Sequence, residues 1–224
     1  MFNIVARKTL LGYCRQFPDA ARSLQQWYYE FLKSEFKNFN ELKEVYPNQS
    51  LVKDDRVVFN ILGNKYRLVV RVIFDFKAVQ IKWFGTHAVY DQINVEKIDY
   101  KKGNEIMILK IIKSNKEYEA MLDWVDQMFD RKVKHTSPEG EQVQVALLLL
   151  KEYEDKYHAI PIPDPLEAIK LKMAEKRLKS KDLIGLVVSK GYISSILSGK
   201  KPLTLDIARK FYKKLGVPAE ILLS

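Results

Sequence analysis

The pattern that most constrains the fold lies between Arg56 and Gly85. Apolar and polar residues alternate there over three consecutive stretches, RVVFNI, KYRLVVRVIF and AVQIKWFG. Gly63 and Asn64 lie between the first two stretches, and Asp75 lies between the second and the third. A period of two is typical of β-strands, and a glycine with an asparagine between two such runs is typical of a hairpin turn. These residues are therefore predicted to form an antiparallel meander.

The residues ahead of the meander follow a different spacing. From Arg7 to Phe17 and from Pro18 to Lys37, apolar and aromatic residues recur at intervals of three and four, which is typical of amphipathic helices. Pro18 suits the first helical position, where the missing N–H of proline costs no hydrogen bond. Two helices followed by an antiparallel sheet predict an α+β domain in the first part of the chain.

The composition changes after Tyr100. The stretch KKGNE fits a linker, and residues 115–132 and 141–157 then return to helical spacing. A second break, AIPIPDP, contains three prolines and predicts an extended spacer. The predicted organisation is an α+β domain over residues 1–103, a pair of helices over residues 104–160 and an all-helical domain over residues 161–224.

The charge of the chain points to a polyanionic partner. The formal net charge is +10 and the pI is near 9.4, and basic residues prevail before and after an acidic middle. Nucleic acid is a commoner partner for such a chain than an anionic membrane surface. The single cysteine, Cys14, excludes an intrachain disulfide and a cysteine-rich zinc site. The start MFNIVARKTL has no secretory signal, and the apolar run from Val145 to Leu150 is too short to cross a membrane, so we expect a cytoplasmic protein without a membrane partner.

Two phrases of the meander, RVVFNILGNKYRLVVRV and IKWFGTHAVYD, resemble the HigB toxins of the RelE superfamily. The resemblance extends over the predicted α+β domain and includes the helical phrase LQQWYYEFLKSEFKNFNELKEVYP. It implies a RelE-like fold and an endonuclease that cleaves messenger RNA, either on the ribosome or free of it. It also implies that the enzyme uses no metal and no other cofactor, because the 2′-hydroxyl of the substrate attacks the scissile phosphate.

The side chains of the meander fit that reaction independently. Attack by a 2′-oxygen needs a proton acceptor, a proton donor for the leaving oxygen, and cations for the charge that develops on phosphorus. Alternation along residues 66–74 places Arg67 and Arg71 on the same face of the strand, where two guanidinium groups predict a phosphate clamp. His87 and Tyr90 follow the next strand, and we expect His87 to act as acid or base and Tyr90 to be its partner or a ring that stacks on a base.

Three further side chains around the predicted hairpin turn are candidates for RNA contacts: Asn60, Asn64 and Lys65. Lys65 suits a phosphate. Asn64 has a second explanation at least as good, because asparagine adopts the left-handed backbone conformation that such turns require.

Other features of the same region leave alternatives open. His87 could be a hydrogen-bonded structural residue, as histidines at strand ends often are. Val89 stands where many relatives carry an acidic residue, so a carboxylate that would strengthen the histidine as a base is missing at that position. Trp83 and Phe84 are expected on opposite faces of their strand, one in the core and the other available to stack on a base.

Residues 108–224 resemble the HigA-type antitoxins, whose first helices bind the toxin and whose last domain is an XRE-like helix-turn-helix. The phrase that carries the resemblance best is YISSILSGKKPLTLDIARKFYKKLGVPAEILL. The same residues predict that Ser189 caps a short helix, that Gly199 ends it and that Thr204 caps the next helix. The residues expected to face DNA are Ser189, Lys190, Tyr192, Ser194 and Ser195 in the major groove, with Lys200 and Lys201 on phosphates.

The two resemblances together predict a toxin and its antitoxin in one chain. The partners expected are messenger RNA, operator DNA read as a homodimer, and the antitoxin part bound to the toxin part in cis or from a second copy. Two sets of acids in the middle segment are candidates for contacts with the basic face of the toxin part: Glu152, Glu154 and Asp155, or Asp123, Asp126 and Asp130. The alternative is that they form an ordinary solvated helix face.

Two rival interpretations remain at this stage. The first is a transcription factor whose RelE-like domain has lost catalysis and serves as an interaction module. The second is an engineered linkage of two adjacent genes, which Met107 fits as readily as it fits a natural fusion.

Overall fold

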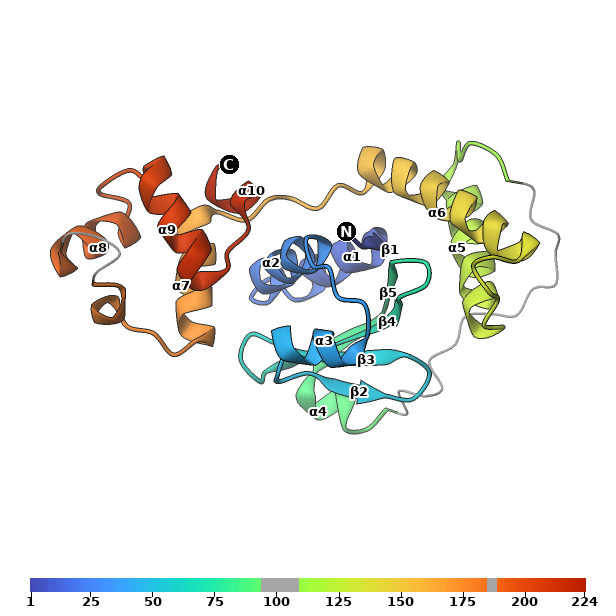
Figure 1. The fold of residues 1–224 in the computed structure, drawn as a ribbon, viewed down its shortest axis with the longest axis horizontal. Helices are drawn as coiled ribbons and strands as arrows, with labels where there is room; N and C mark the ends of the chain where they lie inside the picture. Colours follow the sequence, from blue (N-terminus) through green and yellow to red (C-terminus); the bar gives the residue numbers. More distant parts are fainter. Residues whose placement is uncertain (94–108, 185–188) are drawn as a thin grey trace. The chain divides into compact units, whose positions relative to one another are not determined.

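A computed structural model describes residues 1–93, 109–184 and 189–224, without the side chain of Lys190. The chain forms two compact units, and neither is continuous in sequence. The first unit comprises Met1–Phe17 with Ser34–Ile160, and the second comprises Pro18–Lys33 with Pro161–Ser224. Figure 1 names the elements of both units. The predicted domain boundary at residues 103 and 104, and Met107, lie outside the described residues.

In the described part of the first unit, five strands form one sheet: β1 (Asn3–Val5), β2 (Ser50–Val52), β3 (Arg56–Ile61), β4 (Tyr66–Ile73) and β5 (Ala78–Thr86). Their order is β1-β5-β4-β3-β2. Strands β3 to β5 form the predicted antiparallel meander, and β2, which was not predicted, extends it as a further antiparallel strand. The expectation of a purely antiparallel sheet is wrong, because β1 pairs with β5 in parallel. The stretch NIV is too short to show a strand period, and a parallel pair needs a long crossover, which here runs through helices.

Helix α1 (Arg7–Gln16) follows β1 and packs against β5. The sheet face toward α1 carries Leu68, Val70 and Val72, which are at most 1% exposed. Phe84 pairs with Leu68 across the two strands, and its ring contacts that of Phe17, with 5.2 Å between centroids. The opposite face therefore carries the alternate residues of β4, namely Arg67, Val69 and Arg71.

Two short helices of the first unit had no predicted bounds, although the first of them lies within the phrase at residues 24–47 that was described as helical. Asn38 begins α3 (Phe39–Val45) by accepting hydrogen bonds from the backbone N–H groups of Asn40 and Glu41, each at 3.0 Å. Thr86 begins α4 (His87–Tyr90) in the same way, through the N–H of Val89 at 3.4 Å. Both helices are shorter than the window over which a helical period can be recognised.

The two helices predicted for the middle segment are confirmed as α5 (Asn115–Asp130) and α6 (Pro138–Tyr157). Ser114 and Glu117 form a reciprocal capping box at the start of α5, and Ser137 caps α6 through the N–H of Gly140. The two helices pack against each other, and α6 also packs against β1, so the middle segment belongs to the same unit as the sheet.

The second unit is helical in its described residues. It contains α2 (Ala21–Leu32), α7 (Pro165–Glu175), a 3-10 turn (Ser180–Leu183), α8 (Lys190–Leu197), α9 (Leu205–Leu215) and α10 (Ala219–Leu222). Ile169, Ile193, Ile196, Phe211 and Leu215 are fully buried in its core. Helix α2 is shorter than predicted, and Pro18 lies in the turn before it.

Helix α2 contributes to this unit although it lies among the residues predicted for the α+β domain. Tyr29 packs against the apolar core formed by α7 to α10, and the carboxylate of Glu30 pairs with Lys172 of α7 at 2.7 Å. The side chains of Glu30 and Lys172 are 13% and 15% exposed, so the pair is largely buried. Arg22 and Lys33 pair with Glu167 and Glu220 in the same unit.

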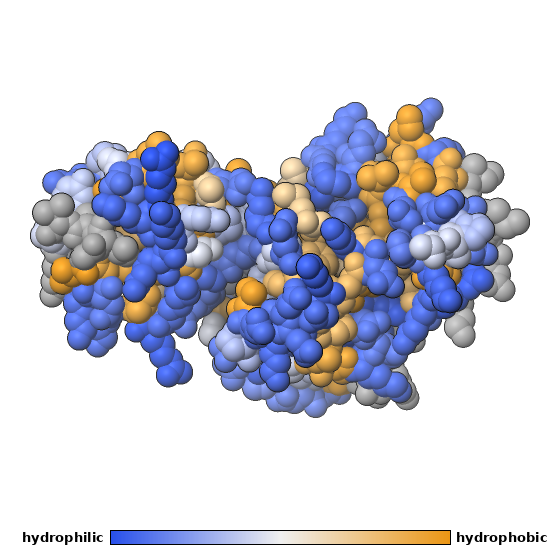
Figure 2. Space-filling model, in the orientation of Figure 1, coloured by the Kyte–Doolittle hydropathy of each residue, from blue (hydrophilic) through white to orange (hydrophobic). Residues whose placement is uncertain are grey.

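The surface seen in Figure 2 is mostly hydrophilic, with separate hydrophobic areas. Two of the exposed apolar side chains, Val145 and Leu148, lie on α6. Within residues 1–93, 109–184 and 189–224, none of the helices combines the length and apolar character that crossing a membrane demands.

Candidate functional site

Arg67 and His87 lie in direct contact. The guanidinium of Arg67, on β4, is 3.0 Å from Nε2 of His87 at the start of α4. A guanidinium can only donate hydrogen bonds, so Nε2 must be the acceptor and the ring proton must be on Nδ1. Arg67 is 9% exposed, whereas the imidazole is 41% exposed. The pair therefore combines a buried cation with an accessible imidazole.

The hairpin turn between β3 and β4 holds this pair in place. The carbonyl of Lys65 accepts a hydrogen bond from the backbone N–H of His87 at 3.0 Å. The carbonyl of Asn64 accepts one from Arg67 at 3.3 Å. The turn that contains Asn64 and Lys65 thus lies beside the pair.

The conformation of that turn corrects one prediction. Positive φ angles occur at Leu62, with 52°, and Gly63, with 69°, and Asn64 is not among the left-handed residues. Asn60 is exposed on β3, and its side chain donates to the carbonyl of Asn48 at 3.2 Å. The ammonium of Lys65 lies 5.2 Å from the ring centroid of Tyr66.

An aromatic surface adjoins Arg67 on the same face of the sheet. Gly85 is the partner of Arg67 across β4 and β5, and the indole of Trp83 lies over it. A Cβ added to Gly85 would be 2.6 Å from Trp83 Cζ2, so only glycine leaves room for this ring. Tyr90 is tilted against Trp83, with 6.1 Å between ring centroids, and packs with Val69. Of the two aromatic residues, Phe84 is therefore in the core and Trp83 is on the site face.

Arg71 has a different environment from Arg67. The two residues share a face of β4, but four residues of strand separate them by about 13 Å. Arg71 is paired with Asp130 of α5 and donates to the carbonyl of Phe129 at 3.1 Å. The structure thus brings Arg67 together with His87 and places Arg71 under α5, so the expected clamp of both arginines beside the histidine is not formed.

Lys82 is a further cation on this face that the sequence did not indicate. It is paired with Asp126 of α5, and the two side chains are 1% and 2% exposed. Burial lowers the pKa of Lys82, and the charge of Asp126 counteracts that effect. The register explains why alternation failed here: Val69 faces Trp83 and Val70 faces Ile81, so Lys82 lies in a β-bulge.

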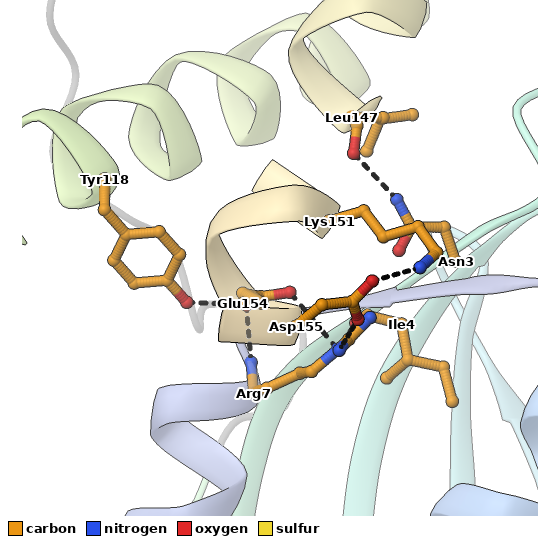
Figure 3. A network of polar contacts seen from close by, with 8 residues as sticks. All are labelled: Asn3, Ile4, Arg7, Tyr118, Leu147, Lys151, Glu154 and Asp155. Atoms are coloured by element: carbon orange, nitrogen blue, oxygen red, sulfur yellow. Dashed lines mark hydrogen bonds and ion pairs between the residues drawn. The ribbon is translucent and has the colours of Figure 1, made fainter. Parts of the chain in front are cut away.

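Two other acids of the middle segment bind elsewhere. Glu154 and Asp155 of α6 both contact Arg7 at the start of α1, rather than the face that carries Arg67 (Figure 3). Glu154 is fully buried and accepts hydrogen bonds from the backbone N–H of Arg7 at 2.7 Å and from the hydroxyl of Tyr118 at 2.6 Å. Burial raises the pKa of Glu154 to about 7, although these hydrogen bonds and the charge of Arg7 lower it. This network fastens α5 and α6 to α1.

In the second unit, Ser189 begins α8 by accepting a hydrogen bond from the N–H of Tyr192 at 3.3 Å. Ser194 is exposed, and the hydroxyl of Ser195 donates to the carbonyl of Gly191 at 2.9 Å. Lys200 is exposed, and the ammonium of Lys201 is 4.3 Å from the ring centroid of Tyr192. These candidate DNA contacts therefore lie on α8 and directly after it. The side chain of Lys190 and residues 185–188, which precede α8, lie outside the described residues.

The helix limits predicted in this region are confirmed with one exception. Gly199 follows α8 with a φ of 73°, and α9 ends at Leu215. Thr204 precedes α9 as expected, but its side chain makes no capping hydrogen bond.

Comparison with known proteins identifies the first part of the chain. Residues 20–93 match the family of HigB toxins, described as the RelE-like toxic component of a toxin-antitoxin system. The chain is also 30% identical over 91 residues to the mRNA interferase toxin HigB of Escherichia coli (strain K12). The same identity relates it to the mRNA interferase HigB of Escherichia coli O157:H7 and of Shigella flexneri.

Each of these matches covers 88% of the relative and 40% of this chain. The matched residues include Arg67, Arg71 and His87. Through residues 20–93, the chain belongs to the HigB family of RelE-like toxins.

Proposed function

We propose that the α+β part of this chain cleaves messenger RNA without a metal, and that the rest of the chain is its attached antitoxin. The observation that carries the proposal is the contact between Arg67 and His87 at 3.0 Å in the segment that matches HigB toxins. The proteins that this segment resembles are named as mRNA interferases. A buried guanidinium beside an accessible imidazole suits phosphodiester cleavage by a neighbouring hydroxyl.

In the proposed reaction, the 2′-oxygen of the substrate attacks phosphorus while the bond from phosphorus to the 5′-oxygen breaks. His87 Nε2 takes the proton of the 2′-hydroxyl, for which Arg67 must turn from the imidazole to the phosphate and stabilise its developing charge. The 5′-oxygen leaves and takes a proton from solvent water, and the other product is a 2′,3′-cyclic phosphate. The hydroxide that remains is neutralised by the proton that His87 has taken up. Tyr90 and Trp83 provide rings on the same face against which a base can stack.

Asp91 compensates for one departure from the family pattern. Val89 is an exposed apolar residue where many relatives carry an acid, but the carboxylate of Asp91 is 3.5 Å from His87 Nε2. Once His87 has taken a proton, this carboxylate can stabilise the imidazolium. Asp91 therefore takes the part of the missing acid in the proposed mechanism.

The antitoxin role of residues 109–160 is supported by the ion pairs of α5. Asp130 and Asp126 neutralise Arg71 and Lys82 on the face that carries the catalytic pair. A covalent tether gives such an inhibitor an effective concentration of about 1 mM, so the free toxin should be rare in the intact chain.

A growth assay tests this part of the proposal. Residues 1–105 expressed alone are expected to arrest growth, whereas the full chain and residues 1–105 with His87→Ala are expected to be tolerated. The relatives are little longer than this region, but α2 packs against residues after Ile160 in the full chain, so circular dichroism of the purified fragment accompanies the assay. Normal growth with a soluble, folded 1–105 fragment would contradict the proposal.

We further propose that residues 161–224 bind operator DNA as a homodimer and repress transcription of the chain's own gene. The support is the short helix α8, capped by Ser189, with Lys200 and Lys201 directly after it. Lys200→Gln with Lys201→Gln should weaken binding of the full chain to its upstream DNA uniformly across sequences. The slope of log affinity against log salt concentration should decrease by the amount that about two phosphate contacts contribute. An unchanged gel shift for this double variant would show that the two lysines do not contact the DNA.

One observation favours a second candidate function. Arg71 and Lys82 are both occupied by acids of their own chain, which suits a repressor whose toxin part is an interaction module without catalysis. RNA cleavage by residues 1–105 discriminates the two, because only the first candidate predicts it.

A further inference from the structure

Three cations gather on one face of the sheet away from His87. Arg56 on β3 and Arg71 on β4 are direct partners across the two strands, and both are 2% exposed. Lys82 joins them from the bulge in β5. We call Arg56, Arg71 and Lys82 the basic cluster.

The basic cluster is an unfavourable arrangement for a sheet alone. Like charges directly opposite each other on neighbouring strands destabilise the pairing, and burial adds to that cost. The lowered pKa of Lys82 reflects the same cost. A face that keeps three such cations together therefore suits a surface that binds an anionic chain.

Helix α5 places two carboxylates against the basic cluster. Asp126 and Asp130 are four residues apart, which places them about 6 Å apart along the helix axis on one side of α5. They pair one by one with Lys82 and Arg71. Two carboxylates at this interval resemble two successive phosphates of an extended nucleic-acid strand in charge and spacing.

We infer that the basic cluster is the track for the RNA backbone on the 3′ or 5′ side of the cleavage point, and that Asp126 and Asp130 occupy two of its phosphate positions. This inference rests on the proposed function and assigns Arg56 and Lys82 to RNA binding. The track leads along β4 to the catalytic pair, because Arg71 and Arg67 share a face of that strand about 13 Å apart. Val69 and Trp83 lie between them on the same face.

The test measures RNA binding rather than cleavage. In the full chain with His87→Ala, Asp126→Asn together with Asp130→Asn should raise affinity for a fluorescein-labelled single-stranded RNA about tenfold or more. Fluorescence anisotropy at several salt concentrations should show a log–log slope steeper by about 1.4, since each phosphate contact to a single strand contributes about 0.7. Lys82→Gln with Arg71→Gln, added to the two aspartate changes, should abolish both effects.

The matched control removes two acids of the middle segment that do not touch the basic cluster. Glu119 pairs with Lys8 of α1, and Glu152 is exposed on α6. Glu119→Gln with Glu152→Gln changes the net charge by the same amount and should leave affinity and slope nearly unchanged. Equal gains in the control and in the aspartate variant, or a gain that survives Lys82→Gln with Arg71→Gln, would overturn the inference.

A milder variant covers the case in which the double aspartate variant does not fold. The side chain of Asp130 is 45% exposed, so Asp130→Asn alone should keep the circular dichroism spectrum of the parent. It should steepen the slope by about 0.7, and an unchanged slope would overturn the inference.

Two further readouts separate this inference from the proposed function. A binding gain without cleavage in the same variants carrying His87 would keep the RNA track and remove the nuclease assignment. Cleavage without the binding gain would keep the nuclease assignment and contradict the RNA track. A gain equal for RNA and for single-stranded DNA would still support the track, since it reads phosphates and not sugars.

Discussion

Alanine in place of Arg67 is expected to slow RNA cleavage by residues 1–105 about 100- to 1,000-fold. The variant removes the cation that the proposed mechanism aims at the charge on phosphorus, and the loss of one such donor costs about that factor in other enzymes. The effect should fall on kcat more than on KM, because the interaction strengthens in the transition state. Single-turnover cleavage of a labelled RNA measures it directly.

Two controls decide whether the loss is specific to the site. Arg15→Ala removes an exposed arginine from α1 and should leave the rate within about twofold, since surface charges contribute little. Arg67→Lys keeps the charge but not the fork of the guanidinium, so its rate should lie between those of the wild type and Arg67→Ala. If Arg67→Ala cleaves RNA as fast as Arg15→Ala, Arg67 does not contribute to the cleavage step.

Arg7→Ala is expected to lower the free energy of unfolding by about 3–5 kcal/mol, which is the usual cost of leaving a buried charge without its partner. Arg7 is 3% exposed and contacts both Glu154 and Asp155 of α6. The neighbouring Lys8 provides the control. Lys8→Ala loses a half-exposed pair with Glu119 and an exposed hydrogen bond to the side chain of Asn115, and should cost less than about 1 kcal/mol. Urea unfolding of the full chain, followed by tryptophan fluorescence, compares the two.

The network around Glu154 also makes the stability of the folded chain depend on pH. The pKa of Glu154 is about 7 in the folded chain, above its ordinary value of 4.5. The folded state therefore binds this proton more tightly, and stability from this group is greatest below about pH 4.5 and decreases as the pH rises to about 7. Glu154→Gln should flatten the dependence of stability on pH across that window. A variant with the same dependence as the wild type would show that another group titrates there.

Much of the fold was predictable because its periodic stretches are long. The runs from Arg56 to Gly85 became β3, β4 and β5, and the helical spacing of the middle segment became α5 and α6. Among the elements without a prediction of their own are β1, β2, α4 and α10, each of four residues or fewer. Elements of that length are specified by tertiary contacts more than by local pattern.

The candidate site was predictable in its chemistry and not in its geometry. Alternation placed Arg67 and Arg71 on one face, and the family phrase singled out His87. Neither pattern shows that α5 pairs with Arg71 and not with Arg67. Lys82 could not be assigned a face because the bulge at that residue interrupts the alternation. Trp83 was expected either in the core or at the site, and only the packing over Gly85 decides between them.

The placement of α2 changes what a single cut in the backbone can achieve. Residues 18–33 complete the core of a unit whose other residues all follow Pro161, through Tyr29 and the pair of Glu30 with Lys172. Segments of the two units therefore alternate along the sequence, and the backbone passes from one unit to the other three times. A protease that nicks the chain once leaves fragments that still share a core. Under the proposed function, one such cut is therefore not expected to separate the toxin part from the rest of the chain.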